Sequence, residues 1–275
     1  MKKYFFILAV CPFLLCCKSG QEDVPEEPAY TPPCSCGLEW PQEETIYQKE
    51  VPWDYPVKPG TEEWEQLSTI QEARDACQIP EDVLSSLSTE DLMQICMQYP
   101  FFKFIYMSST FDGGLEHTFD SFNGLRELFR RDDALKELMK QYRCRIQNWD
   151  FFWNGKASDV EKGWYDLDLR CLEILLSHYQ LPVDSKENYK DILQYLFCGY
   201  EIVYLKRLLE TDFFGSEQWV TGSNSYSRAQ LILKIDEQIL ELIPPRTPWN
   251  CIYVNGRIDK PILRTLDELT CQIIH

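Results

Sequence analysis

Apolar residues recur at intervals of three and four residues over most of the chain beyond residue 60, and this spacing limits the fold more than any other feature. Leu92, Ile95, Cys96 and Tyr99, for example, fall at i, i+3, i+4 and i+7, which places them on one face of a helix. Similar segments are expected at about 61–77, 115–122, 135–142, 159–180, 186–211 and 225–243. The pattern predicts an all-α fold, an antiparallel array of several helices.

Cap residues and glycines mark the expected ends of these helices. Thr61 and Ser88 are predicted N-caps. Asp112–Gly114 is expected to form a turn, and a loop is expected at about 147–158. An Asn-Gly pair between β-branched residues predicts a small hairpin near residues 251–258, followed by a last helix.

The first sixteen residues have the composition of a secretion signal. Two lysines precede an uncharged, mainly apolar run from Tyr4 to Leu15, which suits a signal-peptide core but is too short to span a bilayer. The run ends Leu14-Leu15-Cys16-Cys17, which resembles the lipobox of bacterial type II signal peptides. By that resemblance Cys17 carries acyl chains such as palmitate and anchors the mature chain in a membrane.

Alternatives stay open at this end of the chain. Cys16 is the other candidate for the lipid carrier, and an ordinary cleaved signal is the remaining interpretation. The acidic stretch that ends at Asp23 resembles a tag that sends some lipoproteins to the outer face of the outer membrane, and it equally fits a plain acidic linker. We therefore expect a protein of the cell envelope, lipid-anchored to the outer membrane at its surface or its periplasmic face.

Composition divides the chain into four regions. Residues 1–16 are the signal peptide, and residues 17–60 are a lipidated, acidic tether rich in proline. Fully extended at about 3.1 Å per residue, the tether would reach roughly 130 Å. Residues 61–146 are a helical module. Residues 147–275 are a second helical region with the hairpin, which either continues the first or stands apart.

The net charge of the chain limits the classes of binding partner that are expected. The formal charge is −17, and loss of Lys2 and Lys3 with the signal makes it −19. Nucleic acid and anionic bilayers are poor partners, because binding to phosphates needs a basic surface. The expected partners are a membrane, through the lipid anchor, and a protein or a glycan.

Cysteines are numerous. After loss of the signal and lipidation of Cys17, nine remain, so at least one cannot pair within the chain. Export permits disulfides, yet several cysteines lie on apolar helix faces, and we expect mostly buried thiols with one or two bridges at most. Among the nine, Cys34-Ser35-Cys36 holds the only close pair. A metal site there would need further ligands at matching spacing, which the sequence lacks.

Several short motifs fall between residues 56 and 145. They are Pro56–Trp64, Ala76–Pro80, Leu87–Glu90, Tyr99-Pro100, Phe122–Leu128 and Arg131-Asp132. Together they resemble an uncharacterised helical module found in exported lipoproteins of anaerobic gut bacteria. The resemblance implies no activity, cofactor or site residue, because the motifs are helix caps, stops and turns.

No cofactor is expected, and candidate catalytic groups are few. Four neighbouring polar residues form a candidate cation site, although a solvated helix face is the preferred explanation: Asp112, Glu116, His117 and Asp120. Cys171 and His178 lie on one predicted helix, but their i, i+7 spacing places them about 10 Å apart, too far for a nucleophile–base pair. The sequence contains no zincin, P-loop, nucleophile-elbow or dinucleotide-binding motif.

The aromatic segment at residues 149–153 is the most suggestive binding element. Trp149, Phe152 and Trp153 could stack on sugars or anchor a protein interface. The alternative is structural, with the rings filling the junction between two helical regions. Three functional hypotheses follow: an exported interaction module, a glycan-binding accessory lipoprotein, and, least favoured, an enzyme of unrecognised type.

Overall fold

The computed structural model describes residues 32–38, 50–108, 111–178, 180–205, 222–236, 253–254, 257–258 and 260–275. Residues 32–275 form one compact unit, which contains all of the described residues. The predicted signal peptide, both lipidation candidates (Cys16 and Cys17) and much of the predicted tether lie outside the described residues.

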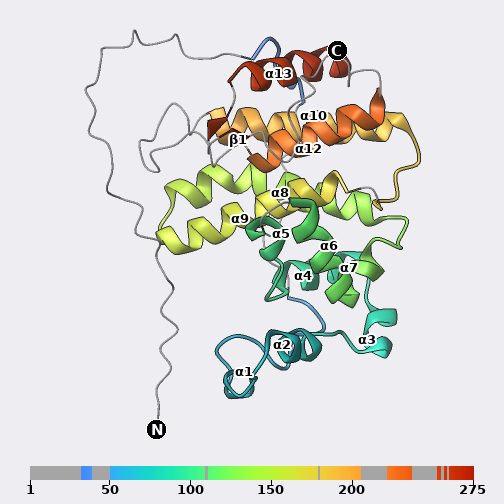
Figure 1. The fold of residues 1–275 in the computed structure, drawn as a ribbon, viewed down its shortest axis with the longest axis vertical. Helices are drawn as coiled ribbons and strands as arrows, with labels where there is room; N and C mark the ends of the chain where they lie inside the picture. Colours follow the sequence, from blue (N-terminus) through green and yellow to red (C-terminus); the bar gives the residue numbers. More distant parts are fainter. Residues whose placement is uncertain are drawn as a thin grey trace. The chain divides into compact units, whose positions relative to one another are not determined.

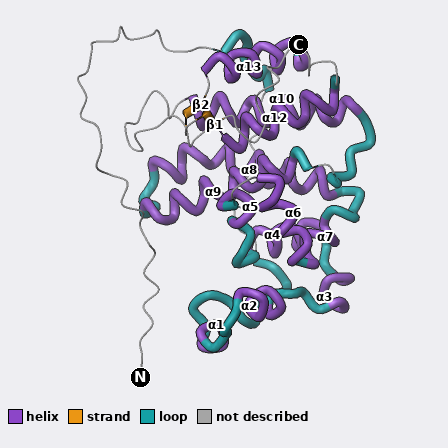
Figure 2. Tube along the Cα trace, viewed as in Figure 1, coloured by secondary structure: helices purple, strands orange, loops and turns teal. Residues whose placement is uncertain are grey.

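The described residues of this unit form helices and the loops between them apart from one small hairpin, so the predicted all-α fold is confirmed (Figure 1, Figure 2). The first seven helices are α1 (Glu62–Glu65), α2 (Ile70–Ala76), α3 (Glu81–Ser86), α4 (Thr89–Gln98), α5 (Phe104–Met107), α6 (Phe111–Ser121) and α7 (Asn123–Leu128). The others are α8 (Ala134–Asn154), α9 (Asp159–Leu176), α10 (Lys186–Gly199), the π-helix η1 (Tyr200–Leu205), α12 (Gly222–Ile235) and α13 (Lys260–Ile274).

The predicted hairpin is also present. Strands β1 (Tyr253–Val254) and β2 (Arg257–Ile258) pair in antiparallel fashion, with Tyr253 opposite Ile258. The two residues between the strands are the Asn-Gly pair that predicted the turn.

The helices pack in layers around a central pair, α8 and α9 (Figure 1). On one side this pair contacts α4, α5 and α6, and α7 packs on α4 and α6. On the other side it contacts α10 and α12, which lie side by side, and α13 contacts both of these. The α8–α9 pair therefore separates a layer formed by α4–α7 from a layer formed by α10, α12 and α13.

Local cap chemistry works as the sequence predicts. The Thr61 hydroxyl accepts a hydrogen bond from the Trp64 N–H at 3.3 Å, and the Ser88 hydroxyl accepts one from the Asp91 N–H at 3.1 Å. Each bond satisfies an N–H group that has no partner inside its helix. The apolar stripe of α4 is buried along its whole length.

Several boundaries differ from the prediction, and three of the differences have a clear physical reason. The helix expected at 61–77 is two helices, because Thr69 caps a new one through the Glu72 N–H at 3.1 Å. The turn expected at Asp112–Gly114 is helical and belongs to α6. A Cβ atom on Gly114 would lie 2.4 Å from the carbonyl oxygen of Ile105, so glycine is needed for close packing of α6 on α5 rather than for a turn.

The third difference concerns the loop expected at 147–158. Helix α8 continues to Asn154, which leaves only residues 155–158 between α8 and α9. The aromatic residues at 149 and 153 continue the i, i+4 and i, i+3 spacing of Tyr142 and Ile146. Trp149 extends the buried stripe of the helix instead of interrupting it.

Candidate functional site

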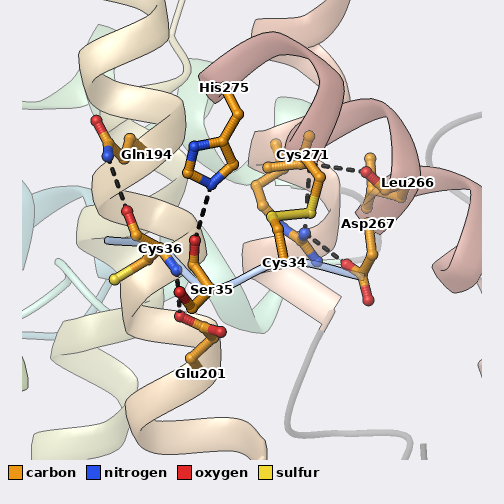
Figure 3. Close-up of a disulfide and its surroundings, with 11 residues drawn as sticks. Cys34, Ser35, Cys36, Gln194, Glu201, Leu266, Asp267, Cys271 and His275 are labelled. Atoms are coloured by element: carbon orange, nitrogen blue, oxygen red, sulfur yellow. Dashed lines mark hydrogen bonds and ion pairs between the residues drawn. A yellow bond between two sulfur atoms is a disulfide. The ribbon is translucent and has the colours of Figure 1, made fainter. Parts of the chain in front are cut away.

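Two disulfides fasten a short segment near the start of the described chain to the helical body. Cys34 is bonded to Cys271 of α13 (Figure 3), and Cys36 is bonded to Cys198 of α10. The first bridge is partly exposed, whereas the second is buried. We call residues 34–36 with these two bridges the clasp. Two bridges agree with the number expected from the sequence.

Hydrogen bonds hold the backbone of the clasp between three elements (Figure 3). The Cys36 N–H donates to the Glu201 carboxylate at 2.7 Å, and the Gln194 amide donates to the Cys36 carbonyl at 2.8 Å. The Nε2 atom of His275 lies 3.0 Å from the Ser35 carbonyl oxygen. Burial raises the pKa of Glu201, and the hydrogen bond from Cys36 opposes that rise. The clasp is therefore fixed by covalent and polar contacts together.

A buried ion pair joins α13, which carries one bridge of the clasp, to α12. Arg228 of α12 contacts Asp267 of α13 at 2.7 Å, and both side chains are fully buried. The guanidinium lies over the rings of Tyr200 and Phe197, at 4.6 and 5.4 Å from their centroids. A paired and stacked guanidinium can be buried where an isolated one could not. This pair fixes α13 against α12.

A second buried polar group lies where α8, α9, α10 and α12 meet. The Glu173 carboxylate accepts hydrogen bonds from the Tyr142 hydroxyl (3.1 Å), the Ser223 hydroxyl (2.5 Å) and the Asn224 amide (3.0 Å). A Cβ atom on Gly199 would lie 2.0 Å from the Tyr142 hydroxyl oxygen, so glycine is required there. The Glu173 side chain is fully buried, so it joins helices and does not meet a ligand.

A groove with a cavity of about 590 Å³ opens between α8 and α10. Lys136 lies on the α8 side, and Asp184 and Asp191 lie on the loop before α10 and on α10 itself. Leu135 and Tyr195 are among the less polar lining residues. This groove is accessible, charged and large enough for a small molecule or a short peptide, so it is the candidate binding site.

The ion pairs at the edge of the groove involve Lys140. Its ammonium lies 2.8 Å from Glu90 of α4 and 3.9 Å from Glu137. Lys136, Asp184 and Asp191, in contrast, form no ion pair with any residue that the structure describes. Burial, and then the nearby Glu187 carboxylate, raise the pKa of Asp191.

The predicted aromatic contact residues lie at the end of α8. The Trp149 side chain is only 2 % exposed and belongs to the core, so neither face of its ring is open to a sugar. Phe152 and Trp153 lie in the last turn of the helix, and the placement of their side chains is outside the described part of the structure. Among the side chains that the structure describes, a large aromatic ring that is exposed is Trp164 of α9, which is 50 % exposed and lies beside the Lys103 ammonium.

The other candidate groups have structural surroundings. The Cys171 thiol donates to the Phe102 carbonyl at 3.7 Å, and burial raises its pKa. The His178 ring packs against Phe119 and Phe129 at 5.3 and 5.4 Å. Cys171 and His178 therefore do not form a catalytic pair.

The candidate cation site, less favoured from the sequence than a solvated helix face, has no support in the geometry of the described residues. Glu116, His117 and Asp120 lie on the exposed face of α6. Across the described ranges, no three histidine, cysteine, aspartate or glutamate side chains are arranged to hold a metal ion.

Comparison with known proteins gives this chain no relative. No family model matches it, and neither a curated protein nor a solved structure is detectably similar to it. Among the helices that the structure describes, none combines the length and apolarity needed to cross a membrane.

Proposed function

We propose that the chain is an exported binding protein, lipid-anchored to the outer membrane through Cys17, with the groove between α8 and α10 as its binding site. The clasp is the observation that carries the proposal. Disulfides persist in oxidising compartments outside the cytosol, and the clasp joins residues that are 237 and 162 positions apart. Such a pairing fits a protein that folds after export.

The clasp also sets the distance between the anchor and the body. Cys34 follows the proposed lipid-bearing residue by 17 positions. An extended chain of that length reaches about 50 Å at roughly 3.1 Å per residue. The reach of roughly 130 Å expected for the whole 17–60 segment is thus shortened, because the attachment point moves from residue 61 to residue 34.

Labelling of cells with radioactive palmitate tests the anchor. Label should appear on the wild-type chain, persist in Cys16→Ala, and vanish in Cys16→Ala/Cys17→Ala. Absence of label on the wild type, or label on the double variant, would refute lipidation at Cys17. Protease treatment of intact cells then distinguishes the surface from the periplasmic face.

Thiol counting tests the clasp in the same cells. After denaturation without reductant, a polyethylene-glycol maleimide should leave Cys34, Cys36, Cys198 and Cys271 unmodified. Prior reduction should make four further sites reactive. Reaction of all four without reductant would remove the observation on which export is proposed.

A further inference from the structure

The unpaired charges of the groove are unequal in number. Three carboxylates (Asp132, Asp184 and Asp191) and one ammonium (Lys136) line the cavity without an ion pair to any described residue. Of the other charged lining residues, Lys140 is paired with Glu137 and, at a shorter distance, with Glu90 outside the lining, and Arg143 adds a third cation. The lining therefore holds four carboxylates and three cationic groups, a small excess of negative charge, and Lys136 is a cation without an ion pair to any described residue.

These charged groups come from both sides of the groove, so a single ligand could contact several of them. Lys136 and Asp191 line one cavity from different helices, yet they form no ion pair with each other. A carboxylate of a ligand could form an ion pair with Lys136, and cationic groups of the same ligand could form ion pairs with Asp184 and Asp191. A cation beside Asp191 would also oppose the rise in its pKa that burial and Glu187 cause.

The lining also includes apolar surface. Leu135 and Met139 lie on α8, Pro182 precedes α10, and Tyr195 lies on α10. These side chains can contact an aliphatic or aromatic portion of a ligand while the charged groups orient it. The chain as a whole is acidic, with a formal charge of −17, so its field favours the approach of a cation.

From this arrangement we infer that the groove binds a short basic peptide with a free carboxyl terminus. The carboxylate contacts Lys136, and the cationic groups contact the carboxylates of Asp184 and Asp191. This inference rests on the proposed role as a binding protein and names its ligand class, but it does not depend on lipidation.

Isothermal titration calorimetry at low salt tests the ligand class. The full chain, purified from the envelope in mild detergent, is titrated with Leu-Lys-Leu, Leu-Gln-Leu and Leu-Lys-Leu amide. The free lysine peptide should bind, and the glutamine peptide and the amide should each bind at least about threefold more weakly, as the loss of one ion pair predicts. Absence of binding by Leu-Lys-Leu, or equal binding of the three peptides, would overturn the inference.

Variants of the groove test the orientation. In Lys136→Met the advantage of the free carboxylate over the amide should disappear, while the control Lys190→Met, altered on α10 outside the groove lining, should keep it. In Asp184→Asn/Asp191→Asn the advantage of lysine over glutamine should disappear, while Asp82→Asn on α3 should keep it. Unchanged preferences in both groove variants would place the ligand elsewhere.

The peptide and the lipid experiments fail separately. If palmitate labels Cys17 but no peptide binds, the ligand class is wrong and the anchor stands. If the peptides bind as expected but no label appears, the binding site stands and the anchor is wrong.

Discussion

The layers of helices on the two sides of the central α8–α9 pair are held together differently. Within the layer of α4–α7, which together with α1–α3 we call the aromatic half, the rings of Tyr99 and Phe122 stack at 4.0 Å and those of Phe119 and Phe129 meet edge-to-face at 5.3 Å, although the Lys103–Asp168 ion pair at 2.6 Å also joins this layer to α9. In the layer of α10, α12 and α13, fully buried polar side chains make the contacts, among them the Arg228–Asp267 pair and the groups that meet Glu173 of α9.

The cysteines divide in the same way. Among the described residues, the four bridged cysteines lie in the clasp, α10 and α13. Cys77 and Cys96, in the aromatic half, are buried free thiols, and burial raises the pKa of Cys77 to about 11. Apolar contacts tolerate substitutions that conserve volume. Removing one partner of a buried charged contact leaves the other without compensation and costs more free energy, and the two disulfides lie on this polar side of the molecule.

Breaking the buried ion pair should give the largest effect. Arg228→Met leaves the Asp267 carboxylate buried without its partner, which should cost about 3–5 kcal/mol of unfolding free energy. Denaturation by urea of the oxidised chain measures the loss. Arg228→Met/Asp267→Leu should recover most of it, and a double variant as unstable as the single one would contradict the proposed pairing.

Removing the buried bridge should have the next largest effect. Cys36→Ser/Cys198→Ala should lower the unfolding free energy by about 2–4 kcal/mol, because the unfolded chain gains freedom. The matched control is Cys77→Ala/Cys96→Ala in the aromatic half, which removes two buried sulfurs and should cost about 1 kcal/mol for each. An equal loss of unfolding free energy in the two double variants would show that the disulfide bond contributes no stability beyond that of two buried sulfur atoms.

Near-isosteric substitutions sharpen the contrast. Glu173→Gln turns an acceptor of three hydrogen bonds into a group that is partly a donor, which should cost about 1–3 kcal/mol. Met97→Leu, in buried apolar surroundings on α4, should cost less than about 1.5 kcal/mol. If thermal melts show a larger loss of stability for Met97→Leu than for Glu173→Gln, the buried polar contacts are not more sensitive to substitution than the apolar ones.

The smallest effect concerns pH. Lys234 of α12 donates to the Ser177 carbonyl at 2.6 Å, and burial lowers the pKa of Lys234 from 10.5 to about 8. Below pH 8 both the folded and the unfolded chain hold this proton, and the folded chain bears the full cost of burying the charge. Between about pH 8 and 10.5 the unfolded chain binds more protons, so stability rises with pH.

Comparison with Lys234→Met isolates that group. The wild type should gain stability relative to the variant as the pH rises from 8 to 10.5, as measured by urea denaturation at each pH. The gain should be modest, because solvent screens a partly exposed ammonium. Parallel curves for the two proteins would contradict the lowered pKa.

The sequence predicted those features of the fold that local chemistry decides. The caps at Thr61 and Ser88, the stripe of α4 and the hairpin at 253–258 each depend on residues within one or two turns of each other. The sequence does not predict that Asp112–Gly114 is helical, because the need for glycine at residue 114 comes from its close contact with a carbonyl group of α5 and not from its neighbours in sequence. The low helix propensity of glycine is overridden where tertiary packing favours a helix.

The candidate site was less predictable. The groove needs side chains from α8 and α10, which are about 50 residues apart, and their approach depends on packing. One signal was available in the sequence: Lys136, Lys140 and Arg143 recur at i, i+4 and i+7, on one face of a helix. The aromatic segment at 149–153 looked more distinctive, yet Trp149 continues the buried stripe of α8.

The clasp has a consequence for biosynthesis. Cys34 and Cys36 are made first, and their partners follow 237 and 162 residues later. Because a chain emerges from its N-terminal end, these two thiols meet each other, Cys77 and Cys96 before Cys198 and Cys271 exist. Any early, incorrect bridge must then be exchanged by thiolate attack. The yield of correctly bridged protein should therefore depend on a disulfide isomerase in the compartment where the chain folds.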